Sequence, residues 1–116
     1  MGKESLLTMD INDYQIDALR TTSKKDDKLK IIEGVMGLNG EAGECVDIVK
    51  KYLFQGHKLD KKHLAEELGD VAWYITLTAD SIGYSLGEVL LMNIDKRAKR
   101  YPDGFKKENS VNRKEK

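Results

Sequence analysis

Two pairs of acidic residues constrain this chain more than any other feature of its sequence. Glu41 and Glu44 form one pair, and Glu67 and Asp70 form the other. Each pair lies in a stretch with a helical apolar pattern, and residues three apart on a helix are neighbours on one face. Four carboxylates between two helices repel one another unless a cation lies among them. The sequence therefore predicts a site for a hard divalent metal, with Mg²⁺ as the first choice because it prefers oxygen ligands.

The angular positions of the acids support a shared site. At about 100° per residue, Glu41 and Glu67 each lie about 60° from the apolar stripe of their helix, and Glu44 and Asp70 each lie about 120° from it. A single acidic pair is more often a solvated helix face. Two pairs at matching angles on adjoining helices favour a metal site over two solvated faces.

The apolar periodicity predicts helices and no strands. Asp10 and Asp60 are expected to cap the first and third helices, and Ser85 with Glu88 is expected to form a capping box for the fourth. Glycines between Gly34 and Gly40 would allow a break in the second helix. The predicted fold is an all-α antiparallel bundle of about four helices, with expected bounds Ile11 to about Thr22, Lys28 to Phe54, Lys61 to Ile82 and Leu86 to about Arg100.

Composition narrows the function classes. The 116 residues are expected to form a single domain, with a helical core over about residues 10–105 and a basic, flexible tail over 106–116. Equal numbers of basic and acidic residues argue against stable nucleic-acid binding. Cys45 is the only cysteine and lies on an apolar stripe, so we expect a buried thiol in a reducing cytoplasm. No apolar run is long enough for a membrane span.

Polar residues on the fourth predicted helix are a second indication of a ligand. Its apolar face becomes polar at Asn93, Lys96, Arg97 and Arg100. The arginines could answer the dipole of the helix end, but an amide among cations also suits a polyphosphate. Lys51 lies near the same edge as Glu44.

The third predicted helix is apolar almost all round from Val71 to Ala79. Tyr74, one turn after Asp70, is either a stacking group for a planar ligand or a core residue. Trp73 and Leu77 point to the opposite side and are interpreted as a subunit interface. A di-iron site is disfavoured, because His63-x-x-Glu66 has the reverse order of the usual Glu-x-x-His motif and is placed away from the acidic edge.

The combined motifs resemble a known family. They are Glu41-x-x-Glu44 in GLNGEAGE, Glu67-x-x-Asp70 in EELGDVAWY, and a segment from Asn93 through Arg100 to Phe105. These residues are similar to the MazG-like, all-α nucleoside triphosphate pyrophosphohydrolase superfamily. The similarity extends over about residues 10–113.

The resemblance implies an enzyme that cleaves a nucleoside triphosphate between its α and β phosphates, giving a monophosphate and pyrophosphate. It implies that Glu41, Glu44, Glu67 and Asp70 hold Mg²⁺, with Mn²⁺ as a substitute, and that the protein is a homodimer or homotetramer. Glu44 is the first guess for the base that activates water. The substrate-binding residues are then expected to be Lys51, Asn93, Lys96 and Arg100 at the phosphates, with Gln15 and Tyr74 near the base or sugar.

Two alternatives stay open from the sequence. One is a non-catalytic helical module that binds nucleotides or proteins, although such a module has no need of four close carboxylates. The other is a di-iron or ferritin-like protein. The preferred nucleotide is not readable, because a few side chains in the pocket decide base choice.

Overall fold

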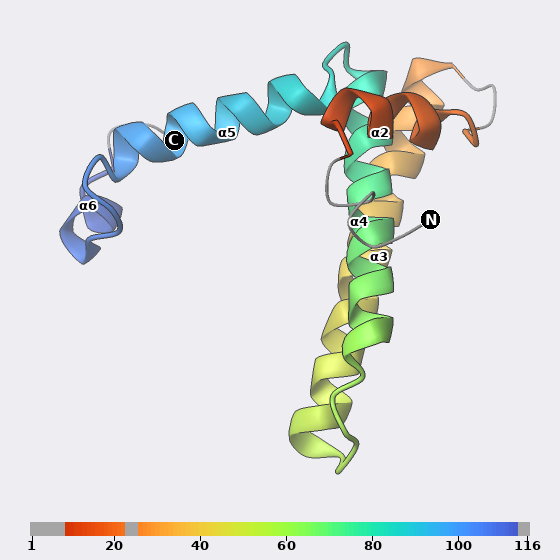
Figure 1. Ribbon diagram of the computed structural model, residues 1–116, viewed down its shortest axis with the longest axis vertical. Helices are drawn as coiled ribbons and strands as arrows, with labels where there is room; N and C mark the ends of the chain where they lie inside the picture. Colours follow the sequence, from red (N-terminus) through yellow and green to blue (C-terminus); the bar gives the residue numbers. More distant parts are fainter. Residues whose placement is uncertain (1–8, 23–25, 114–116) are drawn as a thin grey trace. The chain divides into compact units, whose positions relative to one another are not determined.

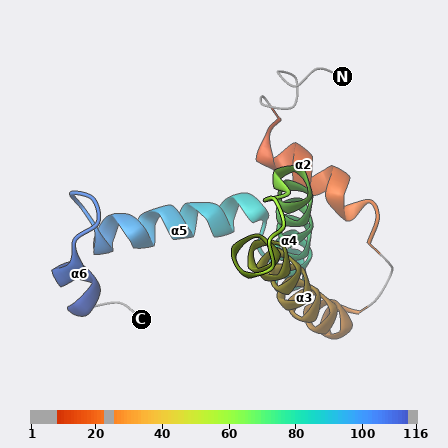
Figure 2. The same cartoon turned by 90° about the horizontal axis from the view of Figure 1, so that it is seen from below.

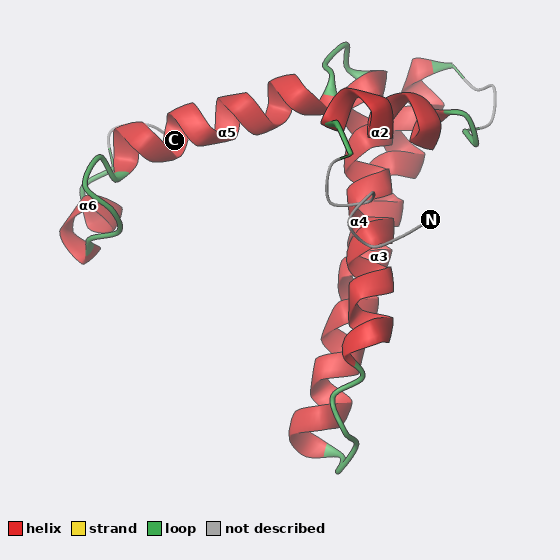
Figure 3. Cartoon of the chain, in the orientation of Figure 1, coloured by secondary structure: helices red, strands yellow, loops and turns green. Residues whose placement is uncertain are grey.

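The computed structural model describes residues 9–22 and 26–113, and these residues are predominantly helical. Figures 1 and 3 show the helices, and no extended strand occurs in the described ranges. The all-α prediction is confirmed. The helices are α2 (Ile11–Leu19), α3 (Asp27–Phe54), α4 (Lys61–Ser81), α5 (Leu86–Arg100) and α6 (Lys107–Val111).

The chain divides into two compact units, of which the first ends at Leu86 and the second begins at Gly87. In the first unit, α3 and α4 lie side by side as an antiparallel hairpin, joined by a turn over residues 55–60 (Figure 1). Helix α2 lies across α4 in both views (Figure 2). The predicted antiparallel packing is thus confirmed for α3 and α4, whereas the four-helix bundle and the single domain stay predictions.

Acidic side chains begin the three helices of the first unit. Asp10 accepts a hydrogen bond from the backbone N–H of Asn12 at 2.7 Å, and Asp60 accepts one from that of His63 at 3.0 Å, as predicted. Asp26 accepts from the backbone N–H of Leu29 at 2.9 Å and starts α3 one residue earlier than expected. Gly56 and Gly83, with φ of 73° and 85°, follow the ends of α3 and α4.

Two glycines bring α3 and α4 into close contact. A Cβ atom on Gly37 would overlap the ring of Tyr74, and a Cβ on Gly34 would overlap the hydroxyl of Thr78. The absent side chains therefore make room for α4, which offsets their low helix propensity. Helix α3 runs unbroken from Asp27 to Phe54, so the break allowed between Gly34 and Gly40 does not occur.

Helix α2 covers the side of α4 that the sequence analysis assigned to a subunit interface. The indole Nε1 of Trp73 donates a hydrogen bond to the backbone oxygen of Ala18 at 3.0 Å, and Leu77 is fully buried. The interface prediction for Trp73 and Leu77 is therefore wrong. These side chains pack within the chain, where α2 removes the apolar surface from water.

The second unit contains most of α5, a turn and α6. The ring centres of Tyr101 and Phe105 lie 5.1 Å apart. The guanidinium carbons of Arg97 and Arg100 lie 5.5 Å and 5.9 Å from the centre of the Tyr101 ring. Cations over an aromatic face are attracted to its negative potential. The expectation of little structure after Phe105 is wrong for Lys107–Val111, which form α6.

The glycine contacts predict opposite effects of two alanine substitutions on α3. Gly37→Ala should lower the free energy of unfolding by about 1–3 kcal/mol, since the added methyl displaces Tyr74. Gly43→Ala should raise it by about 0.5–1 kcal/mol, because a Cβ there meets no atom within 4 Å and alanine favours helix. Urea denaturation of both variants measures the difference. Equal effects would contradict close packing at Gly37.

Candidate functional site

Three of the four predicted carboxylates meet between α3 and α4. Glu41 comes from α3, and Glu67 and Asp70 come from adjacent turns of α4. One carboxylate oxygen of each lies within 4.8 Å of the others. Three oxygen ligands on two packed helices are a donor set that suits a hard divalent cation.

Glu67 is the central member of this carboxylate cluster. Its side chain is only 16% exposed, and its Oε1 lies 3.2 Å from the imidazole Nε2 of His63. Its Oε2 is buried and has no hydrogen-bond partner among the described residues. An unpaired buried acceptor costs about 1–3 kcal/mol, and more when it is charged. The orphaned oxygen therefore fits a cation held between the three carboxylates.

Glu41 and Glu67 are close enough to affect each other's protonation. A hydrogen bond with Glu67, loss of hydration and the negative charge of Glu67 together raise the pKa of Glu41 above its usual 4.5. Two neighbouring carboxylates favour a shared proton when no cation is present. A bound cation supplies the opposite charge and releases that proton.

A polar pocket of about 250 Å³ lies at the turn of the α3–α4 hairpin. Glu44 lines it and is exposed, one turn beyond Glu41 on α3, and does not belong to the three-carboxylate cluster. Lys51 lines it too, with its Nζ 3.1 Å from a carboxylate oxygen of Asp47. His63 lies both in this pocket and against Glu67, so the pocket adjoins the cluster.

The position of His63 corrects the sequence analysis. The residue was placed away from the acidic edge, but it lies four residues before Glu67 and its ring contacts that carboxylate. Residues four apart share a helix face, so the spacing of His63 and Glu67 in the sequence already indicated that their side chains are neighbours. This part of the argument against a di-iron site is wrong, while the reversed order of the motif still stands.

Helix α2 brings Tyr14 close to the cluster. Burial and the negative charge of Asp70 raise the pKa of the Tyr14 hydroxyl above 10.0, so this group stays protonated at neutral pH. Tyr14 was not among the predicted site residues. Its approach to Asp70 depends on how α2 packs on α4, which no local pattern specifies.

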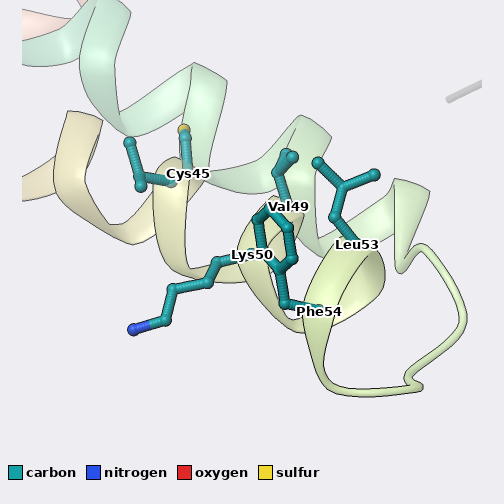
Figure 4. Close-up of a pocket in the computed structure, with 6 residues that line it drawn as sticks. Cys45, Val49, Lys50, Leu53 and Phe54 are labelled. Atoms are coloured by element: carbon teal, nitrogen blue, oxygen red, sulfur yellow. The ribbon is translucent and has the colours of Figure 1, made fainter.

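An apolar groove of about 480 Å³ lies on the last turns of α3 (Figure 4). Cys45, Val49, Leu53 and Phe54 line it, and the amine of Lys50 points away from it. No carboxylate lines this groove, so it is separate from the acidic cluster. Cys45 is half-buried here, whereas the sequence predicted a buried thiol.

Comparison with known proteins gives a family match that contains the carboxylate cluster. Residues 33–105 match the model of the MazG nucleotide pyrophosphohydrolase domain, which is more than half of the chain. The chain belongs to the MazG family. It is also 37% identical over 81 residues to the Gene 37 protein of Mycobacterium phage L5, covering 63% of this chain and 71% of that relative. No solved structure gives a significant match.

The MazG match confirms the resemblance and separates the predicted site residues into two groups. The matched range contains the four acids, Lys51, Tyr74 and the polar face of α5, whereas Gln15 precedes it. No helix among the described residues is long and apolar enough to cross a membrane.

Two of the predicted substrate residues make structural contacts. The ring of Tyr74 packs on Gly37 and lies edge-on to Trp73, with 5.0 Å between the ring centres. This contact gives the ring of Tyr74 a packing role between α3 and α4. The side-chain oxygen of Gln15 accepts a hydrogen bond from the backbone N–H of Leu86 at 2.8 Å, and so joins α2 to the first residue of α5.

In the second unit, Asn93 lies with Arg97, Tyr101 and Phe105 around a cavity of about 370 Å³. Lys96 is exposed on α5. Arg100 lies over the Tyr101 ring. The structure thus groups the predicted amide Asn93 with Arg97, the neighbouring cation on the same face of α5.

The raised pKa of Glu41 predicts how the stability of the metal-free protein depends on pH. A folded-state pKa above 4.5 means that the stability contribution of Glu41 is present below that pH and is lost as pH rises through the raised value. Glu41→Gln should therefore give a higher Tm than wild type near pH 7 in a chelator. The difference should shrink as the pH falls towards 4.5.

Differential scanning fluorimetry across this pH range measures the effect, with Glu66→Gln as the control because Glu66 is an exposed acid on the same helix. Equal pH profiles for Glu41→Gln and wild type would contradict the coupling between Glu41 and Glu67.

Proposed function

We propose that this MazG-family chain is a Mg²⁺-dependent nucleotide pyrophosphohydrolase. It cleaves (d)NTPs between the α and β phosphates to (d)NMP and pyrophosphate, as a housecleaning step on the nucleotide pool. The observation that carries the proposal is the cluster of Glu41, Glu67 and Asp70, in which one carboxylate oxygen of each residue lies within 4.8 Å of the others. Within this cluster, Oε2 of Glu67 is buried and has no hydrogen-bond partner among the described residues.

In this proposal the carboxylates divide between two roles. Glu41, Glu67 and Asp70 hold the metal, and Glu44, from the next turn of α3, is a fourth ligand that the metal does not fully engage. A bound Mg²⁺ offsets negative charge on the phosphates and lowers the pKa of a water molecule. Glu44 is exposed beside the polar pocket, where it is free of the three-carboxylate cluster, so it is our choice for accepting the proton of the attacking water.

The polar pocket at the hairpin turn supports a phosphate-binding role for Lys51. Lys51 lies with Glu44 in this pocket, and its ion pair with Asp47 is half-exposed. Such surface pairs are worth only about 0–1 kcal/mol, so a phosphate can replace Asp47 as the partner. Asn93, Lys96 and Arg100 of α5 are proposed as further phosphate ligands, and Gln15 and Tyr74 as groups near the base or sugar.

We also propose a cytoplasmic homodimer or homotetramer. The support is the apolar groove on α3, whose residue Phe54 is 80% exposed and lies beside Leu53 and Val46, which are also exposed. A contiguous apolar patch is typical of a protein–protein interface. A second copy of the chain would remove these side chains from water.

The proposed activity is tested by measuring pyrophosphate release from a panel of canonical and modified NTPs and dNTPs, with and without Mg²⁺. Metal-dependent release with the matching monophosphate establishes the reaction and ranks the substrates. Nucleotide binding without release from any of them would instead favour a non-catalytic binding module.

Glu67→Gln should lower Mg²⁺-dependent turnover at least about 100-fold, equivalent to about 3 kcal/mol of transition-state stabilisation. The amide keeps the size of the side chain but removes the charge at the centre of the cluster. Glu66→Gln, one residue away and exposed, is the matched control and should retain activity. Steady-state kinetics measure the turnover of both variants, and circular dichroism checks that each is folded. Full activity of Glu67→Gln would rule out the assigned site.

Phe54→Glu should lower the oligomeric state, because a buried unpaired charge opposes burial of the groove. Lys28→Glu, at the other end of α3, is the charge-changing control. Light scattering after gel filtration gives the mass of each variant. An unchanged mass for Phe54→Glu would remove the groove from the interface.

A further inference from the structure

His63 lies at the acidic cluster, but it has been assigned no role as a metal ligand or as a phosphate ligand. Its Nε2 lies 3.2 Å from Oε1 of Glu67, and its own side chain is 50% exposed. Its backbone N–H is held by the carboxylate of Asp60, which caps α4. The helix cap thus holds the backbone of His63, and the imidazole contacts Glu67 one turn further along α4.

This contact acts on only one of the two oxygens of Glu67. Oε1 faces His63, whereas Oε2 is buried without a partner among the described residues. A glutamate side chain has several rotatable bonds, and fixing it in one conformer costs conformational entropy. A hydrogen bond to Oε1 holds one oxygen of Glu67 in place and leaves the buried Oε2, which has no partner in the described part of the chain, available to a cation.

We propose that His63 is a positioning residue that holds the carboxylate of Glu67 in the orientation needed to bind a divalent cation. The inference rests on the proposed metal site. Nε2–H donates to Oε1, and this requires a proton on that nitrogen, which both the neutral Nε2–H tautomer and the charged ring provide. Partners of this kind, which bind a metal ligand but not the metal, typically change metal affinity 10–100-fold.

His57 gives a matched control. It is the other histidine of the chain and lines the same polar pocket, but His63 is the histidine that contacts Glu67. A general effect of pocket charge or hydration should appear in variants of both histidines. An effect through Glu67 should appear only in variants of His63.

The test is Mn²⁺ binding to the full chain without nucleotide, measured by electron paramagnetic resonance and calorimetry. His63→Ala should raise the Kd for Mn²⁺ about 10–100-fold, because Glu67 loses its partner. His63→Gln should recover most of the affinity, since its amide can donate to a carboxylate four residues away. His57→Ala should bind as wild type does, and circular dichroism confirms that each variant is folded.

Wild-type affinity in His63→Ala would overturn the proposal. Equal losses in His63→Ala and His63→Gln would also overturn it, because they would make the imidazole itself a metal ligand. The proposed function is judged separately by pyrophosphate release: a wild-type chain that binds Mn²⁺ but cleaves no nucleotide would end that proposal and leave the comparison of affinities intact. A wild-type chain that binds no Mn²⁺ would overturn both.

Discussion

The close approach of α3 and α4 is the contact on which the carboxylate cluster depends. Gly34 lies against Thr78 and Gly37 lies against Tyr74. One turn beyond Gly37 on α3 is Glu41, and one turn before Tyr74 on α4 is Asp70. In an antiparallel pair these steps run in the same direction along the contact. The register set by the glycines therefore brings the acids of the two helices together.

The cluster itself opposes folding when no cation is present. Glu41 carries a raised pKa, and Glu67 keeps a buried oxygen without a partner in the described part of the chain. Proteins commonly retain such unfavourable arrangements at functional sites and compensate for them elsewhere. Here the compensation comes from the contacts that hold α2, α3 and α4 together, including the bond of Trp73 to α2.

Local chemistry made much of this structure predictable. The caps at Asp10 and Asp60 and the stops at Gly56 and Gly83 follow from the sequence, and three of the four acids meet as their angles predict. The role of Trp73 was not predictable, because its partner Ala18 is 55 residues away and no periodicity links them. His63 was predictable: at about 100° per residue it falls between Glu67 and Asp70 on the helix.

The register between α3 and α4 also determines where the chain can change length. Inserting one residue between Gly37 and Glu41, or between Asp70 and Tyr74, would turn the acids by about 100° relative to the packed helix surface and separate them. The turn over residues 55–60 lies outside both of these segments, and lengthening a surface turn costs little conformational entropy. Insertions in the hairpin turn should therefore leave the register of the acids intact, whereas insertions between the glycines and the acids should disrupt it.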